Sequence, residues 1–104
     1  MPATIDLERM RTSADQACRL MKVLSNPDRM LLLCEISQGE KCVGELEDIL
    51  DIHQPTLSQQ LTVLRNEELV ETRRDGKLIY YSLSSAIAVD VMTLLYKHYC
   101  RKYI

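Results

Sequence analysis

The sequence has 104 residues, of which 46% are hydrophobic and 27% are charged, and its formal net charge is −2 at pH 7. This length predicts one domain, residues 1–104, with a single core to which a partner subunit could add. The slightly negative charge excludes a strongly basic nucleic-acid clamp, although a limited basic set beside a reading surface remains compatible with DNA binding.

The apolar runs are short, and the chain contains four cysteines. The run at residues 30–34 falls far below the roughly 20 residues that span a membrane. Residues 1–10 carry acidic side chains where a secretory signal has an apolar core. We therefore expect no membrane association and a cytoplasmic location, where the cysteines rest as thiols. Metal binding and redox sensing are then the roles to weigh for them.

Two helices are predicted in the first third of the chain. The first has a narrow apolar seam with alternating spacings of three and four residues, which is typical of a helix that packs on another helix or on a symmetry mate. The seam consists of Leu7, Met10, Ala14, Ala17, Met21 and Leu24. Asn26 suits the N-cap of a second helix and Pro27 its first position, so this helix is predicted from there to about Ser37. Its run at residues 30–34 is apolar all round, which predicts a central buried element.

Residues 43–66 predict a helix, a tight turn and a second helix. Cys42 and Glu45 have the spacing of a capping box before a helix that ends near residue 50. The next helix is predicted from about Gln54 to Asn66. Its inward stripe is formed by leucines: Leu57, Leu61 and Leu64. Its outer face carries short polar side chains: Thr56, Ser58, Gln59 and Thr62. Such groups suit the reading of base edges, although an ordinary polar surface helix has the same pattern.

The elements that follow distinguish these two interpretations. Residues 69–74 and 78–82 are β-rich runs joined through Asp75, Gly76 and Lys77, and Asp-Gly is a strong hairpin signal. A helix-turn-helix followed by a two-stranded hairpin is a winged helix. The sequence therefore predicts a mainly α-helical fold with a β-hairpin wing, in the order of four helices, two strands and a final helix.

The final helix is predicted from about Ala86 to Arg101, with Ser84 as its cap. It is apolar on two sides, and its own core can cover only one of them. A second subunit is the simplest source of the other neighbour. We therefore expect a homodimer through the first and last helices.

With this architecture, residues 14–100 resemble the ArsR/SmtB family of bacterial repressors. The most specific motifs are Leu24-Ser25-Asn26-Pro27-Asp28-Arg29, Val43-Gly44-Glu45-Leu46, Gln54-Pro55-Thr56-Leu57-Ser58-Gln59-Gln60-Leu61 and Arg73-Arg74-Asp75-Gly76-Lys77. The resemblance implies a dimer that binds palindromic double-stranded operator DNA, represses transcription and leaves when an inducer acts. It places the helix of residues 54–66 in the major groove. The expected DNA-binding residues are Gln54, Thr56, Ser58, Gln59, Arg73, Arg74 and Lys77.

The metal sites of this family are incomplete here. Metal-sensing members carry two thiolates at the start of the third helix, whereas this chain has Cys42 but Gly44 at the second position. Zinc-sensing members place paired ligands along the last helix, where this chain offers Asp90 and His98 without a second histidine. We expect no bound metal and no cofactor.

Two cysteines match a narrower, BigR-like branch of the family, which responds to sulfide and persulfide. These are Cys34, at the end of the leucine-rich second helix, and Cys100, near the end of the last helix. The resemblance implies that one thiolate attacks a persulfide and the other resolves it, which leaves a disulfide or polysulfide bridge that releases DNA. Residue type alone would make Cys34 a small buried hydrophobe. It would make Cys42, at a helix N-terminus, the more reactive thiol. We favour the Cys34/Cys100 pair because Cys42 has no obvious partner.

Other functions fit the sequence less well. A metal- or arsenical-responsive repressor that uses Cys42 with Cys34 or Cys18 is the alternative within the same fold. A thiol oxidoreductase needs a Cys-x-x-Cys pair or an acid/base partner, and the sequence has neither, so no enzymatic activity is expected. A pure protein-interaction module would not bind an operator.

Overall fold

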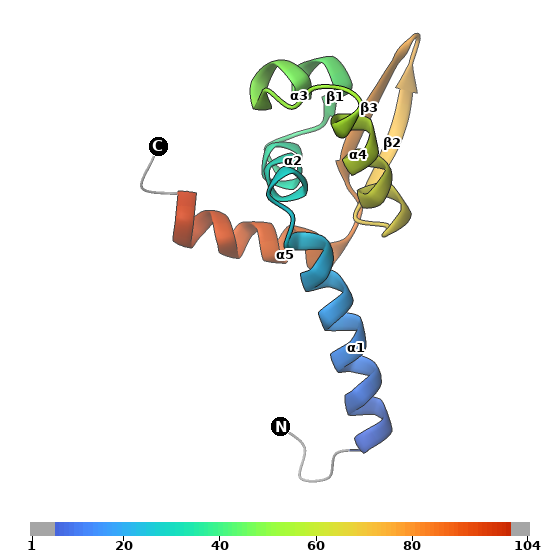
Figure 1. Cartoon of the computed structure of the whole chain (residues 1–104), viewed down its shortest axis with the longest axis vertical. Coiled ribbons are helices and arrows are strands. Elements are labelled where there is room, and N and C mark those ends of the chain that lie inside the picture. Colours follow the sequence, from blue (N-terminus) through green and yellow to red (C-terminus); the bar gives the residue numbers. More distant parts are fainter. Residues whose placement is uncertain (1–5, 101–104) are drawn as a thin grey trace.

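The computed structural model describes residues 6–100. The order of its elements follows the sequence-based expectation, with the added short strand β1 (Lys41–Cys42) before the third helix. The helices are α1 (Leu7–Leu24), α2 (Pro27–Ser37), α3 (Val43–Leu50), α4 (Thr56–Asn66) and α5 (Ala86–Leu95), and α5 continues into a π-helical turn, η1 (Tyr96–Cys100). The strands are β1 (Lys41–Cys42), β2 (Val70–Asp75) and β3 (Leu78–Leu83). The predicted helical fold with a β-hairpin wing is confirmed (Figure 1). The expected end of the last helix, Arg101, lies outside the described residues.

Side-chain caps set the start of several helices. The Asn26 side chain accepts a hydrogen bond from the Arg29 backbone N–H at 3.0 Å, and Pro27 occupies the first turn of α2, as predicted. The expected cap of the last helix was wrong by one residue. Ser85 caps α5 by accepting from the Ala88 N–H at 3.2 Å, because Ser84 is still held to the preceding elements by its hydroxyl, which donates to the Glu68 carbonyl at 3.1 Å.

The fourth helix also starts later than predicted. It begins at Thr56, and Pro55 occupies its N-cap position. Gln54 lies before the helix, where its side-chain oxygen accepts from the Ser58 backbone N–H at 3.1 Å. This bond supplies a partner for one of the N–H groups that the first turn of a helix leaves free. Gln54 is therefore a capping residue of α4 and not its first turn.

The wing is part of a three-stranded antiparallel sheet with the order β1-β3-β2. Tyr80 in the central strand pairs with Arg73 of β2 on one side and with Cys42 of β1 on the other. Gly76 turns the hairpin with a φ of 63°, a left-handed conformation that favours glycine. The sequence did not indicate β1, because two residues are too few to show the alternation that marks a strand.

The core lies between the helices and the base of the sheet. Leu57, Leu61 and Leu64 of α4 are all buried, so the predicted inward stripe is confirmed. They join Leu32 and Leu33 of α2, which are fully buried, in one apolar cluster. The prediction that α2 is buried all round was wrong at Leu31, which is 46% exposed. One side of α2 therefore faces outward.

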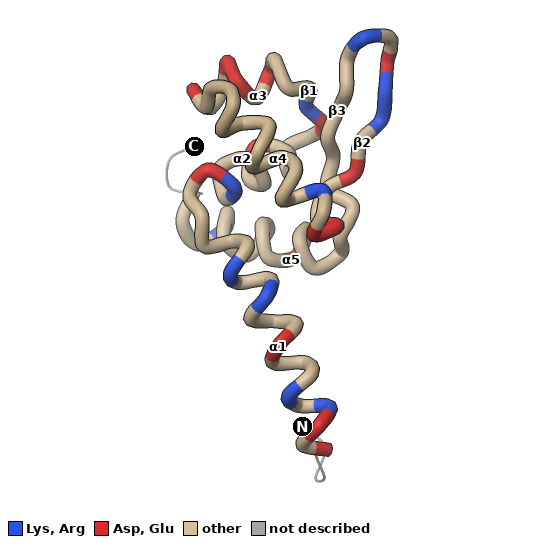
Figure 2. Tube along the Cα trace, turned by 45° about the vertical axis from the view of Figure 1, so that its right-hand side comes forward, with Lys and Arg blue, Asp and Glu red and all other residues tan. Residues whose placement is uncertain are grey.

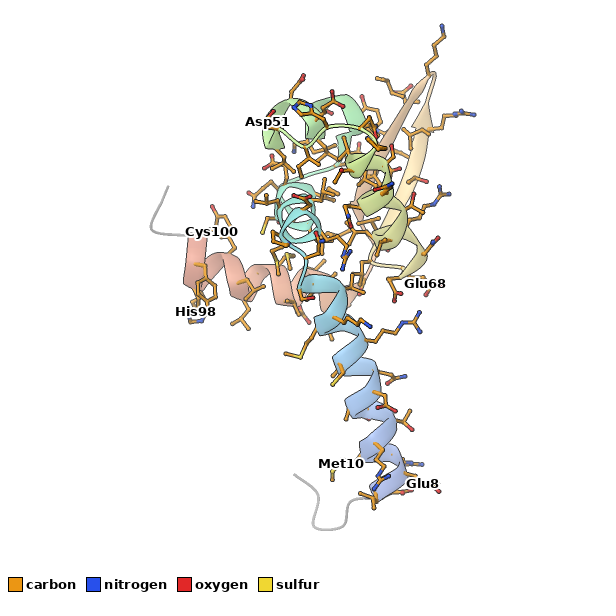
Figure 3. All side chains as sticks on the ribbon, in the orientation of Figure 1. Glu8, Met10, Asp51, Glu68, His98 and Cys100 are labelled. Atoms are coloured by element: carbon orange, nitrogen blue, oxygen red, sulfur yellow. The ribbon has the colours of Figure 1, made fainter. Side chains whose placement is uncertain are left out.

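Helix α1 projects away from this core (Figure 1), and Val23 is its one buried residue. The radius of gyration is 15.7 Å, whereas a compact chain of this length has about 13 Å. In the apolar seam of α1, Leu7 is 58% exposed and Met21 is 68% exposed. Met10 of the same seam is labelled in Figure 3 and is also exposed. In α5, Ile87 and Leu94 are 54% and 55% exposed. No helix within residues 6–100 has the length and apolar character needed to cross a membrane.

Candidate functional site

The outer face of α4 is polar because its leucines turn the opposite face inward. Ser58, Gln59 and Thr62 are exposed, and Thr56 is half-buried. The Thr62 hydroxyl donates to the Ser58 carbonyl at 2.8 Å, so it is satisfied within the helix. Ser58 and Gln59 therefore present the hydroxyl and amide groups most open to a ligand on this face. Such groups both donate and accept hydrogen bonds, as the reading of base edges requires.

The wing carries the three basic residues singled out in the sequence, and the structure separates them into two kinds. Figure 2 shows Lys and Arg along β2 and at the tip of the hairpin. Arg74 and Lys77 are exposed, and neither forms an ion pair with any of residues 6–100. Their charges are therefore available to neutralise phosphates.

Arg73 is already occupied by two partners. Its Nε donates to both carboxylate oxygens of Glu40, at 2.8 and 3.1 Å, and its guanidinium lies 4.6 Å from the centre of the Tyr80 ring. The hydrogen bond from Arg73 is the main cause of the lowered pKa of Glu40. Sequence reasoning missed this pairing because Glu40 lies far from Arg73 in the chain. A guanidinium stacked and paired in this way is less available to DNA than Arg74.

Arg29 joins α2 to the two helices on either side of it. Its Nε donates to the Val23 carbonyl in the last turn of α1 at 2.7 Å, and its Nη1 donates to the Gln60 side chain of α4 at 2.9 Å. A second link is exposed: Arg19 of α1 makes a two-pronged contact with Glu67 after α4, at 2.8 and 3.2 Å. The sequence assigned no role to Arg29 or Arg19. Together they fix α4 relative to the projecting helix.

The structure brings Cys34 and Cys100 together from distant parts of the chain. Both side chains are half-buried, Cys34 on α2 and Cys100 in the last turn of η1, and both are free thiols. Burial raises the pKa of the Cys34 thiol, and the charge of Cys100 and a hydrogen bond with it raise that pKa further. His98 projects from the opposite side of η1 (Figure 3). The two thiols therefore lie near each other.

The other two cysteines lie elsewhere. Cys42 is buried and stands before α3, where its backbone N–H donates to the Glu45 carboxylate at 3.0 Å, as the predicted capping box requires. Cys18 is exposed on α1. In the part of the chain that the structure describes, no three or more His, Cys, Asp or Glu side chains are grouped so as to hold a metal ion. His53, in the turn before α4, is exposed and lies 2.8 Å from an Asp51 carboxylate oxygen.

Comparisons with known proteins find relatives of this fold. The family model for bacterial regulatory proteins of the arsR family matches residues 26–72. The biofilm growth-associated repressor of Xylella fastidiosa is 47% identical over 93 residues, which are 89% of this chain and 82% of that protein. The crystal structure of the transcriptional repressor BigR from Xylella fastidiosa superposes with a TM-score of 0.86 at 44% identity and covers 95% of this chain and 98% of that one. A homodimeric winged helix-turn-helix DNA-binding domain from Mycobacterium bovis superposes with a TM-score of 0.76 at 27% identity, over 99% and 94% of the two chains.

Proposed function

The chain belongs to the arsR family of bacterial regulatory proteins, and from this premise we propose that it is a homodimeric repressor that senses reactive sulfur species. It holds a palindromic operator in its reduced form and releases it when a bridge joins Cys34 to Cys100. The neighbouring position of these two free thiols, on the fold of a BigR-like repressor, is the observation that carries the proposal.

DNA binding is supported by the two surfaces that face outward from the winged helix. The polar face of α4, with Ser58 and Gln59, has the groups that read base edges in the major groove. Thr56 and Gln54 border its N-terminal end, where a reading helix contacts bases. Arg74 and Lys77 of the wing supply phosphate contacts, and Arg73 contributes less while Glu40 holds it.

The dimer is supported by apolar surface that the single chain leaves uncovered. The seam of α1 is exposed at Leu7, Met10 and Met21, and α5 exposes Ile87 and Leu94. One relative of this fold is described as a homodimer. A two-fold dimer through α1 and α5 would cover both surfaces and place the two reading helices on successive turns of the operator.

The chemistry begins at Cys100. The raised pKa of Cys34 leaves it a smaller thiolate fraction than an ordinary thiol has, and the thiolate is the nucleophile. We therefore assign the first attack to Cys100. Its thiolate takes the outer sulfur of a persulfide RSSH, the S–S bond breaks, RSH leaves, and Cys100 becomes a persulfide. The Cys34 thiolate then attacks the Cys100 sulfur, HS⁻ leaves, and a disulfide forms. Overall, one RSSH and two thiols give the disulfide, RSH and H₂S. If Cys100 carries additional sulfur when Cys34 attacks, a longer bridge results.

The bridge acts by fixing the end of α5 to α2. Helix α2 packs on α4 in the core, whereas α5 carries the exposed residues assigned to the dimer. A covalent link between α2 and η1 therefore changes how each reading helix is held relative to the dimer axis. Two half-sites spaced by one helical turn can then no longer be matched at the same time.

The test compares release of the upstream promoter in a mobility-shift assay. Wild type, Cys34→Ser, Cys100→Ser and the matched control Cys18→Ser should all bind the promoter when reduced. After treatment with cysteine persulfide, wild type and Cys18→Ser should release it, whereas the other two variants should not. Mass spectrometry should find a Cys34–Cys100 bridge in the proteins that release.

Two results would contradict the proposal separately. If persulfide still releases the promoter from both Cys34→Ser and Cys100→Ser, the proposed sulfur sensing is wrong, and the proposed role as a repressor is unaffected. Failure of the reduced wild type to shift its own promoter would remove the repressor part. A parallel titration with Zn²⁺, Cd²⁺ and arsenite, followed by thiolate charge-transfer absorbance, tests the metal-responsive alternative.

A further inference from the structure

Helix α4 is tied to the last turn of α1 by one guanidinium. The Nη1 of Arg29 donates to the side-chain oxygen of Gln60 on α4 at 2.9 Å. The Nε of Arg29 donates to the Val23 carbonyl at 2.7 Å, and its Nη2 donates to the Lys22 carbonyl at 3.5 Å. These carbonyls belong to the end of α1, where a helix leaves its last carbonyls without intrahelical partners and favours a positive charge. Arg29 therefore caps α1 and holds Gln60 at the same time.

A second contact joins the same two helices at another level. Arg19 lies one helical turn before Val23 on α1, and its guanidinium donates to both carboxylate oxygens of Glu67, at 2.8 and 3.2 Å. Glu67 is the C-cap residue of α4 and follows Gln60 by seven residues, which is about 10 Å along a helix. A single contact would let α1 turn about it, whereas two contacts at separate levels oppose that rotation.

Apolar packing alone does not set the direction of α1. Val23 is its one buried residue, and most of the helix projects from the core (Figure 1). An open groove of about 650 Å³ runs between α1, the residues that follow α4 and the start of α5, and Leu20, Asn66 and Ile87 are among the residues that line it. The space between α1 and the end of α4 is therefore not filled by side chains. The polar contacts hold the angle between the two helices.

This angle matters because α1 and α4 serve different parts of the proposed dimer. The exposed seam of α1, with Leu7, Met10 and Met21, is assigned to the partner subunit, and α4 is assigned to the DNA. In a two-fold dimer the angle within each subunit occurs twice, so it sets the separation of the two reading helices. The half-sites of an operator lie one helical turn apart, and both must be matched at once.

We propose that Gln60 and Arg19 are positioning residues for operator binding. Through Arg29 and Glu67 they fix α4 relative to α1 and thereby select the spacing between the two half-sites. The proposal rests on the dimeric DNA-binding function above and is independent of the sulfur chemistry. It extends the specificity of the protein from the base pairs of each half-site to the distance between the half-sites.

The experiment measures the affinity of the reduced protein for three duplexes. A footprint of wild type on the upstream promoter first locates the two half-sites. The duplexes then carry both half-sites at their natural spacing, both half-sites with one base pair inserted at the centre, or one half-site with the other scrambled. The insertion moves one half-site by about 3.4 Å and turns it by about a tenth of a helical turn.

The variants remove each contact while keeping a long side chain. Gln60→Met removes the oxygen that accepts from Arg29, and Gln60→Glu keeps an oxygen there and tests for rescue. Arg19→Met removes the ion pair with Glu67. Arg11→Met is its matched control, because Arg11 is exposed on α1 and forms no ion pair with any of residues 6–100. Circular dichroism checks folding, and light scattering checks that each variant has the same number of subunits as wild type.

Gln60→Met should bind the naturally spaced duplex about tenfold more weakly than wild type, the effect of one lost hydrogen bond to a charged group. Its affinity for the single half-site should stay within about twofold of wild type, because one subunit binds that site without reference to the other. The spacing penalty, which is the ratio of the dissociation constants for the inserted and natural duplexes, should therefore shrink by about tenfold. Arg19→Met should show the same pattern at about threefold, because water already solvates this exposed pair. Gln60→Glu and Arg11→Met should keep the wild-type ratio.

An unchanged spacing penalty in Gln60→Met and Arg19→Met would overturn the proposal and leave the DNA-binding function unaffected. Equal weakening on all three duplexes would also overturn it, because Gln60 would then contact DNA or support the fold of each subunit. If Gln60→Met loses helical structure, Arg19→Met decides alone, since Arg19 is exposed. Failure of the reduced wild type to bind the promoter would overturn the DNA-binding function, and this proposal with it.

Discussion

Arg29 allows a direct test of how the fold holds α4, the helix proposed to contact DNA bases. Its guanidinium donates to the Val23 carbonyl at 2.7 Å and to the Gln60 side chain at 2.9 Å, and so it ties α1 and α4 to α2. The substitution Arg29→Met keeps a long side chain and removes these two bonds, together with the longer one from Arg29 Nη2 to the Lys22 carbonyl at 3.5 Å. Val23 is buried, so its carbonyl loses a partner where water has limited access.

The expected loss follows from these two bonds. A hydrogen bond to a charged group contributes about 1.5 to 3 kcal/mol, and the half-buried position of Arg29 puts each bond at the low end of that range. We expect Arg29→Met to lower the free energy of unfolding by roughly 2 to 3 kcal/mol. With a urea m-value of about 1 to 2 kcal/mol per molar, the midpoint should fall by roughly 1 to 3 M.

The assay is urea denaturation followed by circular dichroism at one fixed subunit concentration, because the stability of a dimer depends on concentration. The control is Arg19→Met, which removes the exposed link to Glu67 and should lower the midpoint much less, since water already solvates an exposed ion pair. Equal midpoints for the two variants, or an unchanged midpoint for Arg29→Met, would refute the view that Arg29 is a structural joint.

Three further predictions follow from single sites. Gly44→Ala should raise the free energy of unfolding by about 0.5 to 1 kcal/mol in thermal denaturation, because a Cβ at this position meets no atom within 4 Å and glycine destabilises a helix. A loss of stability would contradict this prediction. Cys100→Ala removes the charge and the hydrogen bond of Cys100, which help to raise the pKa of Cys34, but leaves its burial. The pH midpoint of Cys34 alkylation should therefore fall below that of the wild type and stay above that of a free thiol. An unchanged midpoint would show that Cys100 has no influence on the Cys34 pKa. Glu40→Gln removes the carboxylate that holds Arg73. In a salt titration, operator affinity should increase and its salt dependence should steepen by about one phosphate contact per subunit. Weaker binding would mean that Glu40 instead positions Arg73 for DNA.

The helices and the wing can be predicted from the amino-acid sequence, because their signals are local. The spacing of Leu57, Leu61 and Leu64 specifies which face of α4 turns inward, and the structure buries all three. The pair Asn26 and Pro27 specifies the start of α2 through a cap and a fixed φ. Asp75-Gly76 specifies the hairpin, since glycine adopts the left-handed turn that joins the strands. Each of these signals acts within a few residues.

Contacts between residues that are far apart in the chain depend on the tertiary packing. The sequence placed Arg73 with the free basic residues of the wing, whereas the fold brings Glu40 to it across the sheet. Nothing local identifies Arg29 as the residue that links α1, α2 and α4. The pairing of Cys34 with Cys100 was implied by family resemblance, and their contact depends on how α5 crosses α2. Such contacts follow from how whole helices pack, because the residues involved are too far apart in the chain for any local pattern to specify them.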